Sequence, residues 1–372
     1  MTNKVLEDLV TATSVKEDVV TNKSNVSNNI DFKIEVYDID KKAYLRENDS
    51  LYINSIPRMP NFIASITVPI TFGFNPIYIK ISIEYEKSIK DNNGVNRIRK
   101  TNYYGDGIPL YESGLANFGN NSNVEPYRKG GTRNFTFQFN KIRGGNAKIS
   151  LFKDEKNTLL IKTFNFKIKG NNPSSKQIND YINEKGYNEN FWFFKNLTMQ
   201  ESSYRQFDSN GTPLFGKPDG FGLTQRDQQY IELSDSQLNY LWDWKINLDT
   251  GIITIENKID YLKELLNKQI TKQAEASFDK NSDNFQIADD ITYDNITFSH
   301  VKSELNGLDD FDKYYPVADS NKKSFLDASL IRLFNGGQFY TLKKITTDQY
   351  EWIVDETDKN DRNYVKAVCE AL

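Results

Sequence analysis

The chain contains one cysteine, Cys369, and one histidine, His300, among its 372 residues. A single cysteine excludes an internal disulfide bond and a cysteine-based zinc site. A Ser-His-Asp triad would have to use His300, and no nucleophile motif accompanies that residue. We therefore predict neither a metal nor a cofactor, and carboxylate chemistry is the catalytic class that remains.

Strong charge of one sign and long apolar runs are also missing. The 47 basic and 51 acidic residues give a net charge of -4, which predicts no nucleic-acid partner, because such partners favour a basic patch. No run of 18 apolar residues occurs, so we expect no membrane span. Residues 1–20 mix acids with apolar side chains, unlike the core of a signal peptide. We expect a protein that is made in the cytoplasm and reaches any outside substrate by a route other than general secretion.

The first half of the chain has a period of two. Residues 1–30 are polar and are predicted to form a flexible arm. From about 31 to 170, apolar and polar residues alternate in runs separated by Gly, Asn and Pro. This pattern is typical of antiparallel strands with one solvent-exposed face. We predict an immunoglobulin-like β-sandwich over 31–170. The aligned apolar residues are Phe32, Ile34 and Val36; Ile77, Ile79, Ile81, Ile83 and Tyr85; Phe135, Phe137 and Phe139; and Phe164, Phe166 and Ile168.

Two short clusters interrupt this pattern: PRMP at 57–60 and IRGG at 142–145. We expect both clusters to form turns, because Pro and Gly are the usual residues of turns. The alternative is that they form a docking surface.

After a linker at 171–175 the period becomes helical. We predict a mostly α-helical domain over 176–372, with a long polar insertion near 279–323. Capping boxes at Ser234 with Gln237, and at Ser324 with Asp327, mark two helix starts. Segments 259–269 and 363–372 are also predicted to be helical. The fold class is therefore α+β in two domains, and we expect residues 174–372 to fold without the β domain.

A glutamate lies on an apolar helix face near the middle of the chain. Phe194, Leu197 and Glu201 follow each other at steps of three and four, so they share one face. A carboxylate in apolar surroundings loses hydration, its pKa rises, and it becomes able to donate a proton near neutral pH. The alternative is a partly solvated glutamate paired with Arg205 at i+4.

Further motifs follow at intervals: GFGLTQ at 220–225, RLFNGGQFY at 332–340, and Tyr364. Each is weak alone, since glycine-rich hexapeptides are mostly loops and Asn-Gly-Gly usually ends a helix. Their order, together with Glu201-Ser202, resembles the catalytic domain of the lytic transglycosylases and goose-type lysozymes. The resemblance covers about 176–372. The matching positions are Glu201 and Ser202; Gly222, Leu223, Thr224 and Gln225, with Thr in place of Met; Asn247 and Gly251; Leu333, Phe334, Asn335, Gly336 and Gly337, with Phe in place of Tyr; and Tyr364.

The resemblance implies a lysozyme-like fold and a substrate, the β-1,4 bond between N-acetylmuramic acid and N-acetylglucosamine in peptidoglycan. Glu201 would protonate the glycosidic oxygen. Ser202 would hydrogen-bond to Glu201 or to the substrate. The loop with Gly222 and Leu223 would let the glycan approach the backbone closely.

The same resemblance gives roles to the remaining polar and aromatic residues. Gln225 and Asn335 would offer amides to the acetamido groups of the sugars. Tyr204, Tyr340 and Tyr364 would supply stacking faces, and simple packing is the equally weighted alternative for all three.

The number of catalytic carboxylates separates two reactions. A transglycosylase needs only Glu201, because the muramic acid's own 6-hydroxyl attacks and gives a 1,6-anhydro product. An inverting hydrolase needs a second carboxylate about 6.5–9.5 Å away to activate water. Asp219 and Asp227 flank the glycine loop and are the candidates. We favour the transglycosylase slightly.

The resemblance and the absence of a signal-peptide pattern imply the partners of the protein. Peptidoglycan glycan strands are the expected substrate. A phage-like or contractile injection apparatus, or release during lysis, is the expected delivery route, with the β domain as the adaptor for that apparatus or for the wall. A function of another class, a non-catalytic glycan-binding or structural component, is the alternative.

Overall fold

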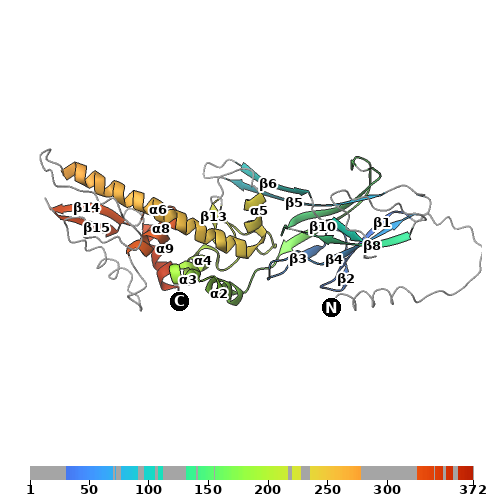
Figure 1. The fold of residues 1–372 in the computed structure, drawn as a ribbon, viewed down its shortest axis with the longest axis horizontal. Coiled ribbons are helices and arrows are strands. Elements are labelled where there is room, and N and C mark those ends of the chain that lie inside the picture. Colours follow the sequence, from blue (N-terminus) through green and yellow to red (C-terminus); the bar gives the residue numbers. More distant parts are fainter. Residues whose placement is uncertain are drawn as a thin grey trace, which may run out of the picture.

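The computed structural model of this chain combines helices with mainly antiparallel sheets (Figure 1). The structure describes residues 31–69, 72, 77–90, 96–104, 108–111, 131–139, 141–154, 156–216, 220–227, 235–277, 325–338, 340–346, 349–354 and 359–371. The predicted arm, the polar insertion and the caps at Ser234 and Ser324 lie outside these ranges. Within them, no helix has the length and apolar character that crossing a bilayer requires.

Two five-stranded sheets form the first half of the described chain. The first sheet has the order β2-β1-β4-β8-β7. Its strands are β1 Lys33–Asp38, β2 Ala43–Tyr44, β4 Phe62–Val68, β7 Ile108–Tyr111 and β8 Gly131–Gln138. The second sheet has the order β3-β10-β9-β5-β6. Its strands are β3 Ser50–Ile53, β5 Tyr78–Lys90, β6 Asn96–Tyr104, β9 Gly145–Phe152 and β10 Leu160–Gly170.

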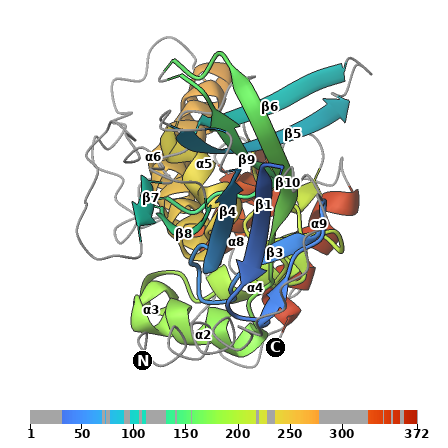
Figure 2. The same ribbon diagram turned by 90° about the vertical axis from the view of Figure 1, so that its right-hand side faces the viewer.

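One hydrophobic core contains residues of both sheets. Val36 and Ile66 of the first sheet and Ile81 and Ile149 of the second are at most 1% exposed. The predicted run from Ile77 to Tyr85 is buried at every second position, which confirms the alternation. Figure 2 views the molecule from the end that carries the two sheets, with most of the helices behind the strands.

One strand pair differs from the predicted antiparallel arrangement. β3 and β10 run parallel, with Leu51 opposite Ile168. Parallel neighbours need a long crossover connection, and here it contains most strands of both sheets. The alternation of apolar residues shows which face is buried but not which strand lies alongside, so the prediction was wrong for this pair.

The second half is mostly helical, and a second hydrophobic core lies among its helices. Leu197, Leu248, Ile331 and Val365 are fully buried there. Helix α6 packs against α8, and α4 packs against α9. The helices are α2 Ser175–Glu184, α3 Tyr187–Asn190, α4 Phe194–Ser202, α5 Asp235–Trp242, α6 Trp244–Ser277, α8 Phe325–Phe334 and α9 Lys359–Glu370. Five short strands accompany them: β11 Phe215–Gly216, β12 Gly220–Phe221, β13 Arg226–Asp227, β14 Tyr340–Thr346 and β15 Gln349–Val354.

The core of the β half extends into the helical half. Trp242, at the end of α5, is 1% exposed and belongs to the same hydrophobic cluster as the residues of the two sheets. Its ring meets Tyr85 of β5 edge-on at 5.3 Å and lies 5.8 Å from the ring of Phe207. A Cβ atom on Gly144 would lie 2.2 Å from the Trp242 ring, so only glycine allows this approach.

The two short clusters of the β half form this junction. Arg143 of the IRGG cluster is 2% exposed and donates from Nη1 to Asn239 Oδ1 of α5 at 2.7 Å. Its backbone N–H donates to the sulfur of Met59, in the PRMP cluster, at 3.2 Å. The docking surface considered for these clusters is therefore present, but its partner is the second half of the same chain.

The linker is also fixed in place. The side-chain oxygen of Asn172 accepts from the backbone N–H groups of Gln206 and Phe207, each at 2.8 Å. Ser174 caps α2 in a capping box with Gln177. Because the halves share a core and a bonded linker, the structure gives reason to expect that residues 174–372 need the β half in order to fold.

Candidate functional site

Helix α4 holds Glu201 in its last turn. Phe194 and Leu197 are fully buried and Glu201 is half-buried, so the predicted helix face is present. The helix ends at Ser202, which places Arg205 beyond it rather than at the i+4 position of a continuous helix. Arg205 Nε donates to the backbone oxygen of Ser202 at 3.3 Å.

Tyr364 of helix α9 donates a hydrogen bond from its hydroxyl to Glu201 Oε1. These residues are 163 positions apart in the sequence, and the packing of α4 against α9 brings them together. Burial, followed by the charge of Glu201, raises the pKa of Tyr364 far above its ordinary value, while Arg332 acts weakly in the other direction. The hydroxyl therefore keeps its proton and acts as a donor throughout the neutral range.

Arg332 lies at the end of helix α8, and its charge acts on Tyr364. Gly336 has a φ of 85°, and the Gly337 N–H donates to Arg332 O at 3.2 Å, which closes the helix end as predicted for Asn-Gly-Gly. The guanidinium is buried beneath Gly337, where an added Cβ would lie 1.8 Å from Nη2. The helix stop thus holds a buried cation whose charge lowers the pKa of Tyr364 slightly.

The backbone is strained directly after Glu201 and at the end of the glycine loop. Six non-glycine residues with positive φ occur in the described ranges, and three of them are Ser203, Tyr204 and Gln225, at 53°, 58° and 46°. Two of these directly follow the Glu201-Ser202 pair. Such conformations cost on the order of 1 kcal/mol or more for each residue and tend to occur at functional sites.

The glycine loop between β12 and β13 is held by two buried amides. Gln206 Oε1 accepts from Leu223 N–H at 3.1 Å, and Asn247 Oδ1 accepts from Thr224 N–H at 2.9 Å. Gly222 has a φ of 71°, and a Cβ there would lie 2.5 Å from Gln206 and 2.6 Å from Asn247. The loop therefore requires glycine because of these internal contacts.

Helix α4, the loop and helix α6 meet at Gly251. A Cβ at this position would lie 2.5 Å from Thr224 Cγ2 and 3.3 Å from the Phe194 ring. Asn247, one turn earlier on α6, also donates from Nδ2 to Phe221 O at 3.1 Å. The segment from Asn247 to Gly251 thus anchors the loop against the helix that carries Glu201.

The other predicted site residues have mixed surroundings. Ser202 is buried, and its hydroxyl donates to Thr198 O at 3.0 Å within helix α4, which is a packing role. Leu223 is fully buried in the helical core, and this burial does not fit a contact with substrate. Gln225 Nε2 donates to Gly222 O at 2.6 Å, while its Oε1 is buried with no hydrogen-bond partner among the described residues.

The predicted residues near the C-terminal end are less fully defined. Asn335 is exposed, and its backbone oxygen accepts from Arg332 at 3.3 Å. Tyr340 begins β14, opposite Val354, and the structure describes its place in the ladder. Tyr204, which follows helix α4, donates its hydroxyl to Lys195 O at 3.3 Å, and burial raises its pKa.

The two candidates for a second carboxylate cannot be placed against Glu201. Asp219 lies outside the described residues. Asp227 is described only in its backbone, which pairs with Gly220 in the β12–β13 ladder. No group of three or more His, Cys, Asp or Glu side chains that could hold a metal occurs in the described part of the chain.

No family model, no curated protein and no solved structure matches this chain. The geometry around Glu201 is therefore the basis for assigning a function. Sequence reasoning missed Gln206 and the nearness of Arg332 to Tyr364. The only local signal for Gln206 is its place beside the buried Phe207, and a polar residue next to an apolar one does not by itself indicate a buried amide.

Proposed function

We propose that this protein is a peptidoglycan-cleaving muramidase, with an immunoglobulin-like β-sandwich followed by a lysozyme-like catalytic domain. The observation that carries the proposal is the hydrogen bond from Tyr364 to Glu201. It joins the first and last members of the motif series that resembles the lytic transglycosylases. The strained backbone of Ser203 and Tyr204, directly after Glu201-Ser202, supports the same location.

Glu201 would act as the general acid and then as the base. It first gives its proton to the glycosidic oxygen between N-acetylmuramic acid and N-acetylglucosamine, and the bond from that oxygen to the muramic acid C1 breaks. The muramic acid's 6-hydroxyl then bonds to C1 and returns its proton to Glu201, which leaves a 1,6-anhydro end. Half-burial at the negative end of helix α4 favours the protonated carboxyl, whereas Tyr364 favours the ionised form. These opposed influences suit a group that must both give and take a proton.

The hydroxyl of Tyr364 provides a direct test. We expect Tyr364→Phe to lower the rate of peptidoglycan clearance by about tenfold, because a hydrogen bond to a charged group contributes about 1.5 kcal/mol or more. Without that donor, Glu201 holds its proton to higher pH, so the basic limb of the pH–rate profile should move upward. The measurement is turbidity loss of purified sacculi across pH. Tyr261→Phe, at a half-exposed position on α6, is the control. An unchanged profile in Tyr364→Phe would count against this role.

The reaction products decide between the two muramidase routes. We expect mass spectrometry of digested sacculi to show mainly anhydro-muropeptides, which are lighter than reducing ends by one water. In that case Asp219→Asn and Asp227→Asn change the rate only modestly. Mainly reducing ends, together with a large defect in one of those variants, would identify a goose-type inverting lysozyme instead.

The remaining parts of the proposal concern context. A phage-like or contractile injection apparatus would carry the protein to the cell wall, with the β-sandwich as its adaptor. A non-catalytic glycan-binding or structural component is the alternative of another class. The turbidity assay separates them, because a binding protein would leave the suspension unchanged.

A further inference from the structure

A hollow of about 320 Å³ opens on the β half, away from the residues assigned to catalysis. It lies within the usual size range of small-molecule sites. The β1–β2 turn, the end of β3 and the start of the linker form its walls. The lining residues are Asp38, Asp40, Lys41, Tyr52, Asn54, Pro60 and Asn171.

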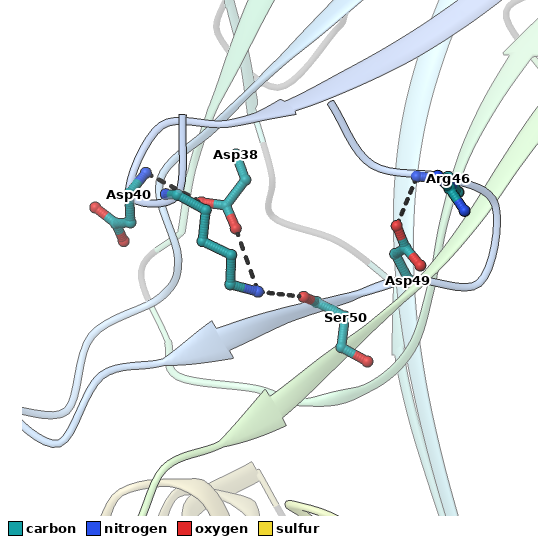
Figure 3. A network of polar contacts seen from close by, with 6 residues as sticks. Asp38, Asp40, Arg46, Asp49 and Ser50 are labelled. Atoms are coloured by element: carbon teal, nitrogen blue, oxygen red, sulfur yellow. Dashed lines mark hydrogen bonds and ion pairs between the residues drawn. The ribbon is translucent and has the colours of Figure 1, made fainter. Parts of the chain in front are cut away.

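Internal contacts hold this hollow in shape (Figure 3). Asp38 is 3% exposed, and its Oδ1 accepts from the backbone N–H groups of Asp40 and Lys41 at 3.0 and 3.1 Å. Lys41 Nζ donates to Ser50 O at 3.1 Å and lies 3.7 Å from Asp38 Oδ2. The same ammonium sits 4.6 Å from the centre of the Tyr52 ring. The turn and the lysine are thus ordered before any ligand arrives.

The lining offers acceptors, donors and an apolar wall together. Asp40 is exposed and supplies a carboxylate. With its amide oxygen turned to accept from Arg58 at 2.9 and 3.1 Å, Asn54 presents its amide nitrogen as a donor. Asn171 adds a second amide, and the partly exposed Tyr52 supplies apolar surface.

We propose that this hollow binds sugar residues of a glycan strand. Sugar hydroxyls both donate and accept, and the carbon face of a sugar ring packs on aromatic surface, so a neutral polyol matches both the polar groups and the Tyr52 ring of the lining. A simple anion would meet two carboxylates, and a simple cation would meet Lys41 already in place.

The assignment of peptidoglycan as the source of the sugar rests on the proposed function. The hollow would then hold the glycan on the β half while Glu201 acts elsewhere on the strand. Because the halves share a buried junction at Trp242, a glycan held by one half is held at a fixed position relative to the other.

The test uses full-length protein carrying Glu201→Gln and soluble peptidoglycan strands that lack stem peptides and carry a photoreactive diazirine. We expect cross-links in the segments 38–44 and 52–54, identified by mass spectrometry. Asp40→Ala and Asn171→Ala should each weaken this labelling by about tenfold, the usual scale for one hydrogen bond involving a charged or polar partner at a binding site. The matched control, Asp31→Ala, removes an exposed acid outside the hollow and should leave the labelling unchanged.

A diazirine-labelled stem peptide is tested in parallel. Labelling of the hollow by the peptide but not by the glycan would overturn the proposal, and so would labelling by neither probe or labelling that both variants leave intact. The catalytic proposal fails on a different result, peptidoglycan clearance by the Glu201→Gln protein, so the two failures are distinguishable.

Discussion

Glu201→Gln is expected to slow the clearance of purified peptidoglycan by at least ~10²-fold, the lower scale for loss of a general acid. Glutamine keeps the shape of the side chain and an oxygen that accepts from Tyr364, so the packing of α4 against α9 is preserved. What is lost is the proton that the glycosidic oxygen must receive. Turbidity loss measures the rate, and circular dichroism checks that the fold is intact.

A matched control is available on helix α6. Glu264→Gln removes the same charge at an exposed position and should leave the clearance rate unchanged. Near-normal clearance by Glu201→Gln would show that another group donates the proton and would contradict the mechanism assigned to this site.

Trp242→Ala is expected to destabilise the whole chain by about 3–5 kcal/mol, the usual cost of removing a large buried aromatic side chain. The ring fills the junction among Gly144, Tyr85 and Phe207, so its loss leaves a cavity in a core that both halves share. Urea denaturation followed by tryptophan fluorescence and by circular dichroism measures the change. We expect one cooperative transition that moves to lower urea in the variant.

The control for this change is Tyr261→Ala, at a ring that is 50% exposed on α6. It should cost much less, because it opens no closed cavity. Two separate transitions in the wild-type protein, with only one sensitive to Trp242→Ala, would show that the halves unfold independently. Residues 174–372 would then be expected to fold alone, as predicted from the sequence.

Hydrophobic spacing determined much of the local structure. The alternation from Ile77 to Tyr85 identified a buried strand, and the steps between Phe194, Leu197 and Glu201 identified the helix face that carries the acid. The Asn-Gly-Gly motif placed the end of α8 correctly, because Gly336 adopts a left-handed conformation that favours glycine. These features depend on residues close together in the chain, so a single sequence contains them.

The sequence indicated positions at which glycine is required, but not which neighbouring residue makes it necessary. The sequence suggested that Gly222 gives room to a ligand, and that IRGG forms either a turn or a docking surface. The structure shows that Gly222 makes room for the amides of Gln206 and Asn247, and that Gly144 makes room for Trp242. A close approach of another group to the backbone requires glycine whichever group it is. Only the tertiary structure shows which group makes the approach.

By itself, the sequence determined that this chain has a β-rich half and a helical half, and that its acid lies on an apolar helix face. The tertiary structure decided which strands are neighbours, how Tyr364 reaches Glu201, and that the two halves share a core at Trp242. The physical reason is that periodicity records whether a side chain faces inward, whereas pairings between distant segments depend on how whole elements pack. Hydrogen bonds such as the one across 163 positions exist only after that packing has formed.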